Sequence, residues 1–425
     1  MQTALAVREG SLVYKTHKGL FEDQKPLHRG ISLFWSQWDE TYWNYSTIDQ
    51  LKLGWGVDFV RLPIGSHEHA KGYQEDMQGN LDKAFLAIDA ALSLGLYVIV
   101  DCHDHHAVQN VHLSSKLLYE VARKYGNNPG ILYEVVNEPL DVSWEEIRSY
   151  AEFVVPLIRS KAPDAICIVG TPQWCRDFTE VRSNPLLLKD IMYTYHFYAE
   201  SHREDCRHDL EDLLRNDFPI FVSECGASDH KGQGDINYRE FDKWLDLLEG
   251  DYRVPWCAWA LNDKEESSSL LVKGTKPEEI SSVLNMTDYG IFIRSRTFSP
   301  LKKLPNWSPY RAGMPSPYAG GREEEKKKVE SLMKRNVSIP VSLLEDFTRS
   351  IFFKLREEPV ALYILWLSQN WRLIDLETRN RLALVIREKY DTLLKDPQPG
   401  DEGILWSMKR MVDTIVYMQK RSVAG

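Results

Sequence analysis

Short apolar runs alternate with amphipathic segments over the first 297 residues of the chain. Runs rich in β-branched residues predict buried strands, and apolar residues spaced three and four apart predict helices that cover a sheet. Eight runs are expected as strands, over residues 30–35, 57–63, 96–103, 132–136, 166–170, 191–198, 218–226 and 254–261. Helices are expected over residues 48–53, 82–94, 114–125, 144–161, 238–248 and 288–296. Eight strand-helix units in about 270 residues predict an α/β fold, and they favour a closed (β/α)8 TIM barrel over an open sheet.

Both ends of the chain depart from this alternation. Residues 11–29 predict an N-terminal hairpin with its turn near Lys18 and Gly19. After the last predicted helix, prolines and glycines accumulate, and apolar stripes at helical spacing then follow. We therefore expect a barrel domain over residues 1–298, a Pro/Gly-rich linker over residues 299–321 and an all-α helical bundle over residues 322–425. The bundle is expected to pack or to bind a protein partner.

Polar side chains stand where the fourth and seventh predicted strands end. Asn137 and Glu138 follow the fourth run, and Pro139 ends that strand because proline lacks a ladder donor. Glu224 ends the seventh run. The carboxyl ends of parallel strands share one face of a barrel, where ligands bind. A lone strand-end Glu is commonly a surface charge or half of a salt bridge, whereas two that converge are the apparatus of glycoside hydrolysis.

A cation and a histidine cluster end two further strands. Arg61 is expected at the end of a strand closed by Pro63. It is either a structural ion-pair partner or a charge that keeps a neighbouring carboxylate ionised. His103 leads into His105 and His106, but near-consecutive residues are poorly spaced as metal ligands. We expect His103 to bind substrate or to orient a carboxylate, and the other two histidines to be loop residues.

The sixth predicted strand ends in His196 and Tyr198, which lie on the same side of the strand by its period of two. A histidine in such a run is commonly a core residue. Two polar aromatics on one face, level with the glutamates, favour a functional role instead.

Composition excludes several classes of partner. The net charge of −10 argues against nucleic-acid or anionic-membrane binding. No run reaches about 18 apolar residues, so no transmembrane segment is expected. The N-terminus lacks the basic start and apolar core of a signal peptide. The 13 Trp and 20 Tyr suit stacking on sugar rings, and the six scattered cysteines predict buried thiols rather than a disulfide framework.

Several short motifs occur together in a fixed order. They are Gly30-Ile31-Ser32-Leu33 before Gln37-Trp38, Arg61, His103, Tyr133-Glu134 through Asn137-Glu138-Pro139, Gly170-Thr171 with Trp174, His196-Phe197-Tyr198, Ser223-Glu224, and Trp259 with Asp263-Lys264. In this combination residues 12–297 resemble glycoside hydrolase family 5, the cellulase family, and most of all its bacterial endoglucanase subfamily 2. Many relatives carry Trp where this chain has Cys102 and Cys225. Cys102 and Cys225 each precede or follow a site residue, so strand alternation points their side chains away from the site. We therefore expect different packing behind the site.

The resemblance implies a role for each matching residue. Glu138 would be the general acid/base and Glu224 the nucleophile, while Asn137 would hydrogen-bond the sugar 2-hydroxyl. Arg61 and Tyr198 would contact the nucleophile. The remaining matches would support the pair or line the sugar subsites: His103, His196, Trp259, Trp38, Trp174, Lys264 and Glu266. Lys264 and Glu266 could equally form a plain loop ion pair.

The implied chemistry is retaining hydrolysis, with carboxyl groups about 5–5.5 Å apart. Glu224 is expected to stay ionised, and Glu138 to keep its proton through proximity to that charge. No metal or organic cofactor is implied. The leading interpretation is an endo-β-1,4-glucanase that acts on a β-glucan. The alternatives are a family 5 enzyme on mannan, xyloglucan or a glycolipid glucan, and a non-catalytic carbohydrate-binding protein. Such substrates lie outside cells, yet no export signal is visible, so the compartment stays open.

Overall fold

The computed structural model describes residues 2–15, 26–66, 70–282 and 285–297. The predicted linker over residues 299–321 and the predicted helical bundle over residues 322–425 lie outside the described residues. Within the described part, none of the helices combines the length and apolar composition needed to cross a bilayer.

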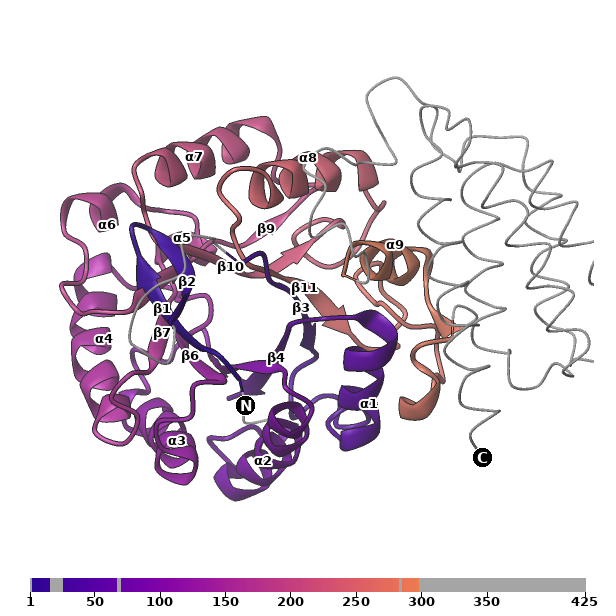
Figure 1. The fold of residues 1–425 in the computed structure, drawn as a ribbon, viewed down its shortest axis with the longest axis horizontal. Coiled ribbons are helices and arrows are strands. Elements are labelled where there is room, and N and C mark those ends of the chain that lie inside the picture. Colours follow the sequence, from indigo (N-terminus) through magenta and orange to yellow (C-terminus); the bar gives the residue numbers. More distant parts are fainter. Residues whose placement is uncertain (1, 16–25, 67–69, 283–284, 298–425) are drawn as a thin grey trace, which may run out of the picture. The chain divides into compact units, whose positions relative to one another are not determined.

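A closed barrel of parallel strands forms the centre of the described part, with helices around its outside (Figure 1). Its strands are β3 (Arg29–Leu33), β4 (Phe59–Gly65), β5 (Tyr97–His103), β6 (Ile131–Val136), β7 (Ile166–Val169), β8 (Ile191–Thr194), β9 (Phe197–Tyr198), β10 (Ile220–Gly226) and β11 (Trp256–Leu261). Strand β11 pairs with both β3 and β10, which closes the ring. Because β8 and β9 are two parts of one interrupted strand along β10, the barrel has the predicted eight positions.

The helices and turns that cover the barrel are α1 (Tyr45–Gln50) with η1 (Leu51–Trp55), α2 (Met77–Ser93), α3 (Val111–Tyr125), α4 (Trp144–Arg159), α5 (Pro172–Cys175), α6 (Thr179–Ser183), α7 (Glu204–Arg215), α8 (Tyr238–Glu249), η3 (Pro277–Glu279) and α9 (Asp288–Thr297). Helix α4 begins with a capping box, in which Ser143 and Glu146 satisfy each other's backbone N–H groups. Helix α2 ends before Gly95, which takes the left-handed conformation predicted for a C-terminal glycine.

The described residues contain an N-terminal hairpin at a position that the hydrophobic pattern did not predict. Strands β1 (Ala4–Arg8) and β2 (Ser11–Lys15) pair antiparallel, so the two-residue turn is Glu9-Gly10. Both turn residues have positive φ, as the twist of a tight hairpin demands. Glutamate is an unusual residue for that conformation, so the sequence does not indicate a turn at this position. Lys18 and Gly19 lie outside the described residues.

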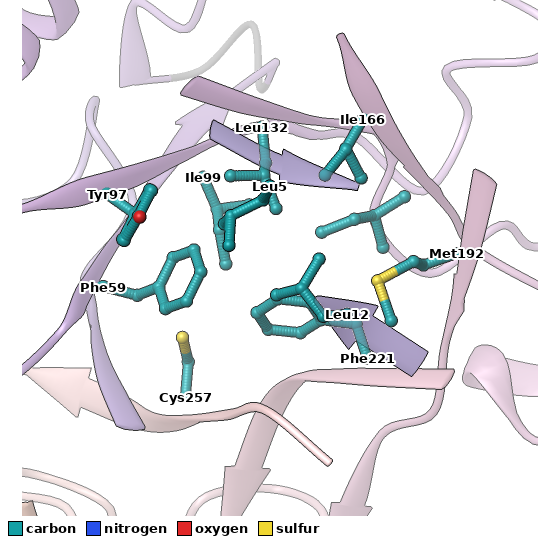
Figure 2. Close-up of a cluster of buried hydrophobic side chains, with 11 residues drawn as sticks. Leu5, Leu12, Phe59, Tyr97, Ile99, Leu132, Ile166, Met192, Phe221 and Cys257 are labelled. Atoms are coloured by element: carbon teal, nitrogen blue, oxygen red, sulfur yellow. The ribbon is translucent and has the colours of Figure 1, made fainter. Parts of the chain in front are cut away.

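The hairpin packs against one end of the barrel. Its Leu5 and Leu12 are buried among inward-facing side chains of the strands (Figure 2). Those side chains are Phe59, Tyr97, Ile99, Leu132, Ile166, Ile168, Met192, Phe221 and Cys257. Most of them come from the first residues of their strands, so this apolar layer fills the N-terminal end of the barrel. The opposite end of the barrel, formed by the carboxyl ends of the strands, is the end where ligands bind in this fold.

Proline does not end β4, contrary to the prediction. The strand continues through Pro63 to Gly65 while pairing with β5. On its other side β4 pairs with β3 only up to Arg61. The carbonyl of Pro63 accepts from Ser36 in the loop beyond β3. The proline therefore faces the side where the ladder has already stopped, and its missing N–H removes no strand bond.

Candidate active site

The carboxyl ends of the barrel strands bring most of the predicted site residues together. They come from six positions around the barrel: Arg61 from β4, His103 from β5, Asn137 and Glu138 after β6, His196 between β8 and β9 with Tyr198 from β9, Glu224 from β10 and Trp259 from β11. One carboxyl oxygen of Glu138, one of Glu224 and a ring nitrogen of His196 lie within 4.8 Å of one another. The two glutamates therefore share one small space.

Arg61 lies at the centre of this cluster and is fully buried. Its guanidinium donates to both carboxyl oxygens of Glu134, at 2.7 and 3.1 Å, and to Glu224 at 2.8 Å. It lies 3.0 Å from Asp101 and donates to the amide oxygen of Asn137 at 2.6 Å. One cation thus holds three carboxyl groups and fixes which way the Asn137 amide faces.

Glu224 is held by two donors. The hydroxyl of Tyr198 donates to its Oε1 at 2.6 Å, and Arg61 donates to its Oε2 at 2.8 Å. Both bonds fix the orientation of the carboxyl group. Burial and the adjacent carboxylate raise the pKa of Tyr198 well above its usual range, so the phenol stays protonated as a donor.

A hydrogen-bonded chain connects Glu138 to the buried carboxylate of Glu134. His196 contacts Glu138 through Nδ1 at 2.9 Å and the Ser223 hydroxyl through Nε2 at 3.0 Å. Ser223 in turn donates to Glu134 at 2.7 Å. The hydroxyl of Thr194 lies 2.6 Å from that of Ser223. A protonated His196 can donate both of these bonds, from Nδ1 to Glu138 and from Nε2 to Ser223.

The protonation of Glu138 differs from the expectation. Burial alone would raise its pKa, but the hydrogen bond and charge of His196 outweigh burial and lower the pKa to about 2. Burial likewise opposes charge on His196, yet its bonds to Glu134 and Glu138 raise the pKa of the imidazole to about 9. In the free site the proton near Glu138 therefore resides on His196.

His103 is a neutral member of the cluster. Its Nδ1 lies 2.5 Å from Asp101, and its Nε2 lies 3.5 Å from the amide nitrogen of Asn137. Burial and the charge of Arg61 lower the pKa of His103 well below its usual range. Burial also raises the pKa of Asp101.

Aromatic side chains flank the cluster. Trp259 stacks on His103, with ring centroids 5.3 Å apart and planes 7° from parallel. Trp38 and Trp174 are exposed on the loops that follow β3 and β7. Lys264 pairs with Glu266 at 2.9 Å, which is the plain ion pair that the sequence left open, and its ammonium lies over the ring of Phe34.

Two buried acids and one histidine complete the site without having been assigned a role from the sequence. Glu134 and Asp101 are carboxylic acids inside apolar strands. An acidic residue in such a run could have indicated a buried carboxylate that needs a partner. His105 was expected to be a plain loop residue, but its Nδ1 lies 3.0 Å from the backbone carbonyl of Glu138. A carbonyl can only accept, so this nitrogen donates.

The two unusual cysteines lie behind the site, as expected. The sulfur of Cys102 lies 3.6 Å from the Tyr73 hydroxyl, and the thiol of Cys225 donates to the carbonyl of Cys257 at 3.3 Å. Both are buried thiols, like three of the other four cysteines.

Glu138, His196 and Glu224 have ligand atoms of the kinds that bind divalent cations. Both ring nitrogens of His196 already engage protein partners, however, and a proton fits between His196 and Glu138 as the structure stands. The arrangement suits proton transfer and nucleophilic attack between two close carboxyl groups.

Replacing Arg61 should destabilise the fold strongly, because it leaves buried carboxylates without a counter-charge. We expect Arg61→Met to lower the free energy of unfolding by about 3–5 kcal/mol. Arg123→Met, which removes an exposed pair with Glu120, should cost less than about 1 kcal/mol. Chemical denaturation of the full-length chain measures both.

The pKa of Glu134, which burial would raise, is lowered to about 2 by Arg61 and His196. The stabilisation from this shift is therefore complete above the ordinary carboxyl pKa of about 4.3 and is lost as the pH falls toward 2. The loss in free energy of unfolding caused by Arg61→Met should therefore become smaller as the pH falls over the same interval. Equal costs for the two arginine variants at pH 7 would contradict this view of Arg61.

Comparisons with known proteins agree on one family. A family model described as cellulase (glycosyl hydrolase family 5) matches residues 20–265. The sequence is similar to endoglucanase Z of Dickeya dadantii, at 37% identity over 67% of this chain and 63% of that protein. It is also similar to endoglucanase A of Butyrivibrio fibrisolvens, at 36% identity over 58% of each chain. The chain thus spans about three fifths of the length of these curated relatives.

Solved structures give the same result. The catalytic domain of Thermobifida fusca endoglucanase Cel5A in complex with cellotetraose aligns with a TM-score of 0.64 and 30% identity, covering 70% of this chain and 97% of that chain. A structure from Cytophaga hutchinsonii aligns with a TM-score of 0.65 and 33% identity, covering 69% of this chain and 94% of that chain.

Proposed function

This chain belongs to glycosyl hydrolase family 5, the cellulase family, and we propose that it is a retaining endo-β-1,4-glucanase. The observation that carries the proposal is the pair of carboxyl groups of Glu138 and Glu224, with oxygens within 4.8 Å of each other. Retaining glycosidases need about 5–5.5 Å between the carboxyl groups, whereas inverting enzymes leave about 6.5–9.5 Å for a water.

The two carboxyl groups have environments that suit different roles. Glu224 is held by hydrogen bonds from Tyr198 and Arg61, which fix the direction of its carboxylate. It is the nucleophile that attacks the anomeric carbon and forms the glycosyl-enzyme. Glu138 shares a proton with His196, so it is the group that protonates the leaving oxygen.

The proton for the first step comes from the pair of Glu138 and His196. Between pH about 2 and about 9 the pair holds one proton, which rests on the imidazole in the free site. As the glycosidic bond breaks, Glu138 passes this proton to the leaving oxygen. In the second step the emptied pair takes a proton from water, whose oxygen attacks the anomeric carbon and releases Glu224.

The remaining residues bind and orient the sugar. Arg61 holds the amide oxygen of Asn137, which leaves its NH2 group to donate to the sugar 2-hydroxyl. Trp259, fixed by stacking on His103, is the platform for the sugar at the cleavage site. Trp38 and Trp174, which are exposed, line the neighbouring subsites, whereas Lys264 and Glu266 are paired with each other.

The relatives' names support an endoglucanase acting on β-1,4-glucan. An enzyme for mannan, xyloglucan or a glycolipid glucan would use the same carboxyl pair. A non-catalytic sugar-binding barrel would not need two glutamates with carboxyl oxygens within 4.8 Å of each other, one of them bonded to a histidine, so this alternative is disfavoured. No cofactor takes part in the proposed reaction, and a protein partner for residues 322–425 stays a proposal.

A reducing-sugar assay on carboxymethylcellulose, mannan and xyloglucan separates these functions. We expect the wild-type protein to be most active on carboxymethylcellulose. Glu138→Ala should lose about 10²–10⁴-fold in kcat/KM, and Glu224→Gln should form no covalent adduct with a 2-deoxy-2-fluoro cellobioside by mass spectrometry. Full turnover by Glu224→Gln would contradict the assignment of the nucleophile, and a preference for mannan would replace the substrate class.

The shared proton predicts the alkaline limit of activity. Because the pKa of His196 is raised to about 9, kcat/KM should fall as the pH rises through about 9, when the pair loses its proton. In His196→Gln the cation that lowers the pKa of Glu138 is gone, and Glu138 alone must hold the proton. The alkaline fall in kcat/KM should therefore move to lower pH. The pH profile of kcat/KM on a soluble cello-oligosaccharide measures this shift. A limb that stays near pH 9 in the variant would rule out His196 as the proton store.

A further inference from the structure

The backbone on each side of Glu138 is held by a side chain that the proposed reaction does not use. The thiol of Cys175 donates to the carbonyl oxygen of Asn137 at 2.9 Å. The Nδ1 of His105 donates to the carbonyl oxygen of Glu138 itself at 3.0 Å. These are the two peptide carbonyls that flank the Cα of Glu138.

We propose that Cys175 and His105 are positioning residues that fix the carboxyl group of Glu138 relative to the leaving oxygen. This inference rests on the proposed function and adds two residues to it. The Cys175 thiol acts through the backbone that carries the acid/base. His105 holds the same backbone by a hydrogen bond, and its Nδ1 also lies 3.9 Å from Oε2 of Glu138.

The need for such a clamp follows from where the two glutamates stand. Glu224 lies inside β10 (Ile220–Gly226), between Val222 and Cys225, which both pair with β11 although the register shifts between them. Glu138 stands two residues beyond the end of β6 (Ile131–Val136). The pairing of β6 with β7 also shifts in register just before that end. Proton transfer demands placement to within a fraction of an ångström, so a backbone beyond the ladder needs other partners.

The turn after β7 is built to deliver the Cys175 thiol. Gln173, Trp174 and Cys175 all have positive φ, at 56°, 55° and 62°. A left-handed turn of non-glycine residues costs roughly 1–2 kcal/mol per residue, and such strain persists where the surroundings enforce it. Here it points Cys175 into the protein, fully buried, while Trp174 stays 45% exposed. The same turn therefore contacts the Glu138 loop on one side and presents a proposed sugar platform on the other.

Gly170 lets this turn approach the Glu138 loop closely. A β-carbon at this position would lie 2.6 Å from the carbonyl oxygen of Asn137 and 2.7 Å from that of Val136. The chain at the end of β7 thus runs directly against the backbone that precedes Glu138. Burial raises the pKa of the Cys175 thiol well above its usual range, so its sulfur keeps the proton that it donates.

His105 clamps the other side of the loop at two points. Its ring donates to the carbonyl of Glu138, and its own backbone carbonyl accepts from the N–H of Leu140 at 3.0 Å. Pro139 lies between these two bonds and has a fixed φ. The segment from Glu138 to Leu140 is therefore held rigidly against the loop that follows β5.

Leaving-group dependence separates a positioning role from a merely structural one. The value of kcat/KM reports the first chemical step, which needs the acid only when the leaving group is poor. For Cys175→Ala and His105→Ala we expect kcat/KM to fall about tenfold or more on phenyl β-cellobioside. On 2,4-dinitrophenyl β-cellobioside, whose leaving group needs no proton, the loss should stay within about twofold.

Conservative variants restore the donors. Cys175→Ser keeps a hydroxyl donor and His105→Asn keeps an N–H at the position of Nδ1, so both should recover phenyl cellobioside activity to within about threefold of wild type. Cys206→Ala, which removes a thiol on α7, is the matched control and should leave both substrates unaffected.

Each outcome bears on the inference. Equal losses on the two substrates, no loss in the alanine variants, or alanine and conservative variants that behave alike would overturn the positioning role while leaving the proposed function intact. A wild-type protein that hydrolyses neither substrate and no β-glucan would overturn the proposed function and this inference together.

Discussion

The ion cluster around Arg61 is the interaction on which the site depends. A guanidinium without solvent contact holds the carboxylates of Glu134 and Glu224, lies against Asp101 and fixes the amide of Asn137. Burying so many charges costs free energy that only close pairing offsets. The closed barrel makes this pairing possible, because strands far apart in sequence end on the same face.

Around this centre the two glutamates differ in how they are held. Glu224 belongs to strand β10 and lies directly against Arg61, so its position is set by the barrel itself. Glu138 lies beyond its strand and is governed by neighbours that come from loops and strand breaks. In the proposed reaction His196, placed where β8 gives way to β9, is the residue that supplies the proton, and Cys175 and His105 are the residues that hold the backbone. A nucleophile must stay fixed, whereas an acid/base must gain and lose a proton, and the two environments match these demands.

The sequence predicted the barrel and most of the site because both rest on strong local signals. Apolar runs ending in Glu138 and Glu224 marked the strand ends, and their shared face follows from parallel pairing. Side-chain networks left weaker signals. A buried Glu134 inside a strand marks an unusual site but does not name its partner, and the dominant effect of His196 on Glu138 depends on a 2.9 Å contact that spacing cannot reveal. The turn at Glu9-Gly10 and the continuation of β4 through Pro63 were missed because each depends on pairing partners elsewhere in the fold.

The stereochemistry of the first product tests the carboxyl geometry most directly. If Glu138 and Glu224 act across the short gap between them, hydrolysis proceeds through a glycosyl-enzyme and retains the β configuration. Proton NMR of cellotetraose hydrolysis, recorded faster than mutarotation, should then detect the β-anomer of the newly formed reducing end first, with the α-anomer growing in later. An α-anomer that appears first would mean inversion through a water between the carboxyl groups, and it would contradict the pairing of Glu138 as acid/base with Glu224 as nucleophile.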